Sequence, residues 1–220
     1  MQNKAYCNLS QWIIMNPQSL LDFHARFHQA WHNSHQCDAI APREEASPAA
    51  SGEHQLGSHW QLHARSEVAS FDNLSKALEL EVNPELSQFY GRFYGGNMAF
   101  AADFGSGELL QAWNEDDFGF LQENLIGHAM MKKKLKQPPT WFLAPMEDSD
   151  AILVLDNSDA TVWLEVPGKE PHQKVADSLD ALLSAIEPKV LMPEPMPASV
   201  PQPGLWQRLK TMGRHLLGKS

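Results

Sequence analysis

Four histidines near the start of the chain are the first residues whose spacing could support chemistry. His24, His28 and His32 recur every four residues, and His35 follows closely. On a helix this spacing places the side chains in one stripe, and histidines so placed can hold zinc. However, no glutamate accompanies them in an HExxH pattern, and neither cysteine stands at a ligand spacing. We therefore interpret them as residues bordering the apolar face of a helix, and we expect no metal and no cofactor.

A second candidate is the run Asn114-Glu115-Asp116-Asp117, which could form an acidic docking point. The same run suits the start of a helix, because an asparagine cap followed by carboxylates complements the positive end of the helix dipole. The lysines between 132 and 136 likewise suit the last turn of that helix. Helix electrostatics explains both runs locally, but one surface can serve both purposes, so docking stays open.

No nucleophile stands in a recognisable catalytic context. The sequence has no GxSxG motif, no phosphate-binding glycine loop and no cysteine in a catalytic pattern. The glycines of Gly95-Gly96 and Gly105-Ser106-Gly107 indicate turns instead. Nothing in the sequence favours an enzyme.

Length and composition limit the class of protein. The 220 residues suit one domain with an appendage, and 43% hydrophobic with 20% charged residues is a globular composition rather than a disordered one. Two cysteines cannot form a disulfide framework, and no apolar run is long enough to span a membrane. Together these features predict a cytosolic protein.

The charge is divided unevenly along the chain. The whole chain carries −10, but five bases and one glutamate follow Pro188, so residues 1–188 carry −14. An acidic body disfavours nucleic acid and anionic lipid as direct partners and favours a basic partner surface.

Hydrophobic periodicity predicts helices and β-hairpins around one core. The segment 36–58 lacks periodicity, and we expect a mobile loop there. Because the strands come in hairpins, we predict an α+β fold (α/β in looser usage), with a mixed, largely antiparallel sheet and packed helices. The first expected helix begins near Pro17. Four further helices are expected at about 72–80, 84–94, 115–136 and 178–187. The expected strands span about 98–104, 108–113, 140–144, 152–155 and 161–166, with turns at 105–107 and 156–159.

The chain changes character after Pro188. We expect a domain over 1–188, a proline-rich linker over 189–204 and a basic amphipathic helix over 205–220. Such a helix could lie on an anionic lipid surface, and docking onto the acidic body is the alternative. The residues expected to contact lipid are Trp206, Arg208, Lys210, Arg214 and Lys219.

Several stretches of this sequence resemble the Syd family, the SecY-interacting proteins. The longest begins as QAWNEDDF at Gln111, continues as QENLIGH from Gln122, and ends at Pro138-Pro139-Thr140. Two shorter stretches, within 25–35 and 89–98, agree with it. The resemblance covers about residues 19–187, whereas the segment 36–58 and the tail after Pro188 depart from the family pattern.

The resemblance implies a fold like that of the SUKH superfamily and a non-enzymatic role. Syd proteins are peripheral proteins on the cytoplasmic face of the inner membrane that bind SecY and check its assembly, docking its cytosolic loops in an acidic groove. From charge clustering around the signature, the residues expected to form the acidic surface are Asp103, Glu108, Glu115, Asp116, Asp117 and Glu123. A competing interpretation is a SUKH-type immunity protein that neutralises a basic toxin, which a neighbouring toxin gene would reveal. An enzyme is the third alternative.

Overall fold

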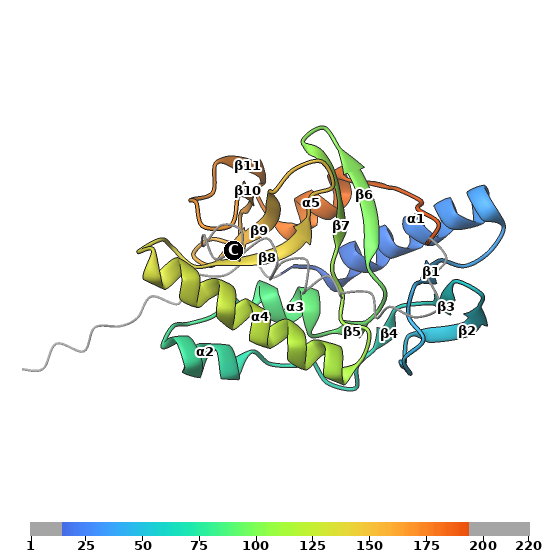
Figure 1. Cartoon of the computed structure of the whole chain (residues 1–220), viewed down its shortest axis with the longest axis horizontal. Helices are drawn as coiled ribbons and strands as arrows, with labels where there is room; N and C mark the ends of the chain where they lie inside the picture. The colour runs from blue at the N-terminus through green and yellow to red at the C-terminus, as the bar shows by residue number, and fades with distance from the viewer. Residues whose placement is uncertain (1–14, 194–220) are drawn as a thin grey trace, which may run out of the picture.

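The computed structural model of the chain describes residues 15–193 and contains an α+β fold, as predicted (Figure 1). The helix predicted at 205–220, with the residues expected to contact lipid, lies outside the described residues. The helices of the described part are α1 (Pro17–His35), α2 (Asp72–Leu78), α3 (Glu85–Tyr90), α4 (Glu115–Lys134) and α5 (Leu179–Ala185). Its strands are β1 (Ile40–Ala41), β2 (Ala50–His54), β3 (Gly57–Trp60), β4 (His63–Ala64), β5 (Phe93–Tyr94), β6 (Met98–Ala102), β7 (Gly105–Leu109), β8 (Thr140–Pro145), β9 (Ile152–Asp156), β10 (Val162–Glu165), β11 (Gln173–Ala176) and β12 (Glu187–Pro188).

Every strand pair in the described part is antiparallel. The orders are β1-β3-β2, β11-β10-β9-β8, β12-β6-β7 and β4-β5. The edge of β7 also meets β8, where Leu110 N donates to Leu143 O at 2.9 Å and Gly107 forms a bridge with Met146. The sheet of β12, β6 and β7 is therefore joined along this edge to the four-stranded sheet of β8–β11.

Side-chain caps account for where the main helices begin. Asn16 Oδ1 accepts from Gln18 N at 3.1 Å, one residue before Pro17 opens α1. Asn114 Oδ1 accepts from Asp117 N at 3.0 Å at the start of α4. These bonds satisfy donors that have no partner inside the helix. The cap predicted at Asn114 is therefore confirmed, and Asn16 caps α1 in the same way.

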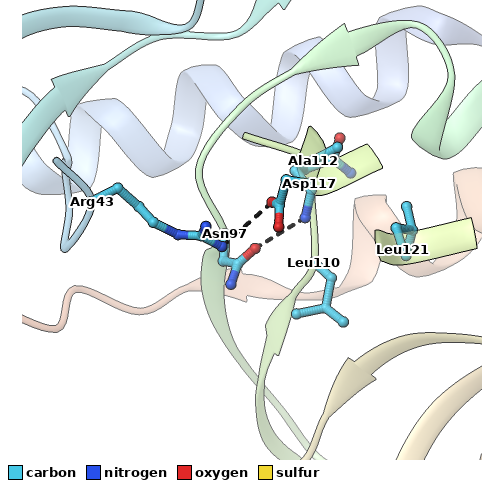
Figure 2. Close-up of a pocket in the computed structure, with 7 residues that line it drawn as sticks. Arg43, Asn97, Leu110, Ala112, Asp117 and Leu121 are labelled. Atoms are coloured by element: carbon cyan, nitrogen blue, oxygen red, sulfur yellow. Dashed lines mark hydrogen bonds and ion pairs between the residues drawn. The ribbon is translucent and has the colours of Figure 1, made fainter. Parts of the chain in front are cut away.

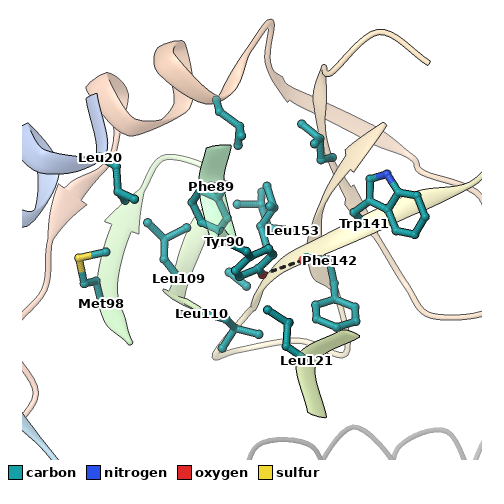
Figure 3. Close-up of a cluster of buried hydrophobic side chains, with 14 of the residues drawn as sticks. Leu20, Phe89, Tyr90, Met98, Leu109, Leu110, Leu121, Trp141, Phe142 and Leu153 are labelled. Carbon is teal, nitrogen blue, oxygen red and sulfur yellow. Dashed lines mark hydrogen bonds between the residues drawn. The ribbon is translucent and has the colours of Figure 1, made fainter. Parts of the chain in front are cut away.

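The core lies between the sheets and helices α1, α3 and α4 (Figure 3). Strand β9 is apolar and buried along residues 152–155, as expected of a strand covered on both faces. Tyr90 is fully buried, and its hydroxyl donates to Phe142 O at 2.9 Å, which ties α3 to β8 (Figure 3). Leu121 from α4 and Leu20 from α1 reach the same cluster.

The prediction of a mobile loop over 36–58 was wrong. This segment contains β1 and β2 and the first residues of β3, and the β2–β3 turn ends at Gly57, whose φ is +136°. The strands are short and β2 is almost entirely exposed, so no apolar alternation marked them in the sequence. Trp60 at the end of β3 holds the sheet to α1, packing against Phe27 at 6.1 Å between ring centroids.

Two further boundaries differ from the prediction. The helix predicted to reach residue 94 ends at Tyr90, because Phe93 and Tyr94 pair with β4 instead. The β6–β7 turn lies at residues 103–104, not 105–107, since Ala102 pairs with Gly105. Gly107 serves a different purpose: a Cβ there would lie 2.7 Å from Pro145 O, so the glycine allows β8 to approach.

Candidate functional site

The segment between β1 and β2 is fastened to the start of α4, which places acidic residues together that are far apart in the sequence. Trp113 Nε1 donates to Glu45 O at 2.8 Å, and Asn114 Nδ2 donates to Ala46 O at 2.9 Å. The Ser47 hydroxyl donates to Trp113 O. We call the resulting surface the acidic end of α4 and define it by the carboxylates of Glu44, Glu45, Glu115, Asp116 and Asp117.

Glu115 is held by neighbours on two other elements. Its Oε2 accepts from Arg65 Nη1 at 2.8 Å and from the Tyr94 hydroxyl at 2.5 Å. The Arg65 guanidinium lies between the rings of Tyr94 and Phe118, 3.9 and 4.2 Å from their centroids. The bond from Tyr94, together with Arg65, lowers the pKa of Glu115 below its usual value. Glu115 is therefore an ionised carboxylate in a fixed orientation.

Asp117 is also engaged, whereas Asp116 points to solvent. Asp117 Oδ2 accepts from Trp113 N at 2.9 Å and lies 3.4 Å from Arg43 Nη2. Asp116 is exposed and has no hydrogen bond or ion pair recorded within the described part of the chain. The acidic end of α4 thus has two members paired with arginine, while Asp116, Glu44 and Glu45 are free to meet another molecule.

The remaining predicted site residues do not all join this surface. Glu123 is exposed on α4 and lies on the same solvent-facing side as Asp116, seven residues earlier. Glu108 lies on β7 and accepts from Asn97 Nδ2 at 3.4 Å. Asp103 occupies the β6–β7 turn, at the opposite end of the hairpin from the Met98–Leu109 pair (Figure 1). It is about 17 Å from that pair along the strand, so it is separate from the acidic end of α4.

The histidine stripe proves to be part of the packing between α1 and the β3–β4 connection. Leu62 N donates to His24 Nε2 at 3.2 Å, and the Gln61 amide donates to His28 Nδ1 at 3.1 Å. Both rings also pack against Trp60. Burial lowers the pKa of His24 to about 3 and that of His28 to about 4, so both are neutral near pH 7.

Unlike His24 and His28, the outer histidines of the stripe, His32 and His35, are exposed. His32 is exposed and its Nε2 lies 2.9 Å from Asp38 Oδ1. Across residues 15–193, no group of three or more His, Cys, Asp and Glu side chains is arranged to hold a metal ion. No helix within those residues is long and apolar enough to cross a membrane.

Sequence reasoning missed Glu44, Glu45, Arg43 and Arg65 as parts of the site. The adjacent Glu44 and Glu45 were the one available signal, but they lay in a segment predicted to be mobile. The lysine run does occupy the last turn of α4, as predicted, but Lys132 differs from its neighbours in its surroundings. Lys132 does not face solvent at the end of α4, because its side chain is fully buried and bonded to Glu165.

Together, the antiparallel sheets, the helices packed against them and the acidic end of α4 define a small α+β domain with a cluster of carboxylates on its surface. A family model described as "Syd protein (SUKH-2)" matches residues 17–188. The chain is 41% identical over 216 residues to Protein Syd of Shewanella loihica, covering 91% of this chain and 97% of that protein. It is 46% identical over 164 residues to Protein Syd of Shewanella pealeana, covering 73% and 77% of the two chains. This chain belongs to the Syd family.

Proposed function

We propose that this protein binds basic cytosolic loops of the SecY translocation channel through the acidic end of α4, and that it checks or regulates the translocase without catalysing a reaction. The Syd resemblance supports SecY as the partner. The charge of −14 on residues 1–188 supports a basic surface on that partner. Cytoplasmic loops of membrane proteins carry an excess of lysine and arginine. The protein would therefore work at the cytoplasmic face of the bacterial inner membrane as a peripheral, loosely associated protein.

The observation that carries this proposal is the fastening of the segment that holds Glu44 and Glu45 to the start of α4. Three hydrogen bonds join residues 45–47 to Trp113 and Asn114. A single exposed ion pair contributes only about 0.2–1 kcal/mol, so useful affinity needs several carboxylates held in one arrangement. A fixed cluster also avoids the entropy lost when mobile side chains are ordered on binding.

The segment 205–217 would add a second contact. Its sequence has an apolar arc with Trp206 and a basic remainder, and each lysine or arginine near an anionic membrane is attracted by about 1 kcal/mol. We propose that it lies on anionic lipid, where it would offset the repulsion between lipid and the acidic body.

Co-sedimentation with vesicles rich in SecY, compared with vesicles lacking it, tests the proposal. Reversing Asp116 and Glu44 to lysine should reduce the SecY-dependent fraction by about tenfold, and added salt should reduce it for the unchanged protein. These two positions are preferable to Glu115 and Asp117, whose reversal would also break bonds to Arg65, Arg43 and Trp113 N.

A matched control reverses the same number of charges at the other end of α4. Glu81 and Glu170 suit this purpose because both are exposed and lie near the C-terminal end of α4. Glu81 O accepts from Asn157 Nδ2, and Asn157 N donates to Pro139 O just after the helix. Glu170 follows Lys169, whose backbone O accepts from Lys132 Nζ in the last turn of α4. A helix of 20 residues separates the two ends by about 30 Å. If reversal at Glu81 and Glu170 weakens binding as much as reversal at Asp116 and Glu44, the acidic end of α4 is not the contact.

A further inference from the structure

The solvent-facing side of α4 carries a line of six exposed residues. In Figure 1, α4 runs across the front of the molecule, and no described element lies in front of it. The line advances in alternating steps of four and three residues, which is the spacing of a coiled-coil seam. We call this line the outer seam of α4, and it consists of Asp116, Phe120, Glu123, Gly127, Met130 and Lys134.

Two large apolar side chains of the outer seam are exposed to solvent. Phe120 is 56% exposed and Met130 is 59% exposed, the highest values among the large hydrophobic residues of the described part. Ten residues of helix place them about 15 Å apart on the same side of α4. The solvent side of a surface helix is ordinarily polar, whereas a coiled-coil seam places apolar side chains at this spacing. The seam is therefore suited to packing against another helix.

The two ends of the outer seam carry opposite charges. Asp116 lies in the first turn of α4 and Lys134 in the last. Neither side chain has a hydrogen bond or ion pair recorded within residues 15–193. Asp117 differs from Asp116, because it lies beside the seam and pairs with Arg43 of its own chain (Figure 2). Asp116 and Lys134 can therefore each pair with a charge on another molecule.

The outer seam is complementary to itself when it is read in the opposite direction. Its residues form three pairs, each equally distant from Leu125: Asp116 with Lys134 at nine positions, Phe120 with Met130 at five, and Glu123 with Gly127 at two. In two antiparallel α4 helices related by a two-fold axis at the level of Leu125, each residue meets its pair on the other copy. Opposite charges then meet at both ends, and apolar side chains meet between them.

The centre of such a pair has room for its one unmatched charge. A Cβ added at Gly127 would meet no atom within 4 Å, so the surface there is open and can receive the stem of Glu123 from the second copy. The carboxylate of that long side chain can turn outward to water. A parallel pair is disfavoured, because it would place Asp116 beside Asp116 and Lys134 beside Lys134.

We propose that the outer seam of α4 is a self-association surface through which two copies of this chain form an antiparallel dimer. The spacing of the seam sets a shallow crossing of about 20° between the helices. A contact made by one helix from each copy is small, so the dimer is weak and its population depends on protein concentration. Because Asp116 also belongs to the acidic end of α4, the dimer occupies a carboxylate that the proposed function offers to SecY.

Analytical ultracentrifugation of the full-length protein, over about 1 µM to 1 mM, measures the dimer. Asp116→Lys should weaken association by about tenfold, because it puts a second positive charge beside Lys134 at both ends of the contact. Lys134→Asp should have the same effect. The protein with both changes should associate within about threefold of the unchanged protein, since the charge pairs form again with their signs exchanged. Weakened folding would instead be greater with both changes, because each opposes the helix dipole.

The apolar part of the contact is tested with two exposed methionines. Met130→Gln should weaken association by about tenfold, because the dimer loses apolar contact in two places. Met192→Gln is the matched control, since Met192 is 42% exposed and lies outside α4. This control should leave association unchanged.

Cysteine cross-linking tests the antiparallel register, in a chain that carries Cys7→Ser and Cys37→Ser. Mixing the Asp116→Cys protein with the Lys134→Cys protein should give a disulfide-linked dimer on mild oxidation, because the two thiols meet in the mixed dimer. Either protein alone should give little, since 18 residues of helix, about 27 Å, separate the two thiols and a disulfide cannot span that distance.

Three results would each overturn the inference. They are a protein that stays monomeric over the whole concentration range, a failure of the exchanged charges to restore association, and cross-linking in the mixture that is no greater than in either protein alone. The inference goes beyond the proposed function and does not rest on it. All three measurements are made without SecY, so each of these results would leave the proposed SecY contact as it stands.

Discussion

Lys132 Nζ lies 2.7 Å from Glu165 Oε2, and both side chains are completely buried. The pair joins the last turns of α4 to β10, and Thr140 Oγ1 donates to the same carboxylate oxygen at 2.9 Å. His128 Nε2 lies 3.0 Å from Thr140 Oγ1 and extends the network along α4. Because two opposite charges satisfy each other here, removing either one leaves the other buried and unpaired.

We predict that Lys132→Met destabilises the protein by about 3–5 kcal/mol, the usual cost of breaking a buried pair. Burial already raises the pKa of Glu165, and loss of Lys132 will raise it further. A carboxyl whose native pKa exceeds its unfolded value binds a proton more tightly when folded, so stability falls as pH rises from about 4.5 through the native pKa. Urea unfolding should therefore show a larger loss at pH 8 than at pH 6.

Lys133→Met is the control for this change, because Lys133 occupies the same turn but is exposed. Its effect should stay within about 0.5 kcal/mol. Equal effects of the two substitutions would mean that the buried pair does not hold α4 in place.

A second prediction concerns acid sensitivity, for which His28 provides the test. Its native pKa of about 4 lies below the ordinary 6.5, so the unfolded chain takes up the proton first as the pH falls. The stability that neutral His28 provides is complete above pH 6.5 and is lost as the pH falls toward 4. Between pH 7 and pH 5 this loss is about 2 kcal/mol. His28→Leu should remove it, so the variant should lose about 2 kcal/mol less than the unchanged protein over that range. Parallel pH profiles for the two proteins would contradict the assignment.

A third prediction concerns the two glycines inside α4. A Cβ added at Gly119 or Gly127 would meet no atom within 4 Å, so neither glycine is required for packing in the described structure. Because glycine in a helix interior costs about 1 kcal/mol relative to alanine, each Gly→Ala change should raise the melting temperature by about 2–4 °C. Gly96→Ala is the contrasting variant, since its Cβ would lie 2.6 Å from Trp60 Cε2 and should lower the melting temperature. Differential scanning calorimetry of the three variants decides the matter.

A fourth prediction separates the tail from the domain. The chain is still fastened at Lys189, whose backbone N donates to Ala99 O at 2.9 Å and whose side chain bonds to Glu147. A chain ending at Pro193 should therefore keep the melting temperature of the full-length protein, and a fall of about 5 °C would mean that the removed residues pack on the domain. In flotation with anionic vesicles the full-length protein should float better than the shortened one. Equal flotation would exclude lipid binding by residues 205–217.

Local patterns were sufficient to predict most helices of the domain. The cap at Asn114, the carboxylates after it and the apolar spacing of Phe118, Leu121 and Leu125 placed the start of α4 at the correct residue. The hairpin of β9 and β10 was also recognisable, because its strands are apolar runs on either side of a polar turn. These signals are carried by neighbouring residues, so they are visible without the rest of the fold.

Only the tertiary structure determined which charges meet. Nothing near Lys132 in the sequence distinguishes it from its exposed neighbours, and its burial depends on Glu165, which lies 33 residues further along the chain. Glu45 and Trp113 are 68 residues apart, yet their contact assembles the acidic end of α4. The sequence is sufficient to predict that a surface is negatively charged and which helix carries the charges, because both follow from composition and local spacing. Which carboxylates are paired, buried or free depends on packing between distant segments, so the pairing of Glu115, Asp117 and Glu165 is visible only in the folded structure.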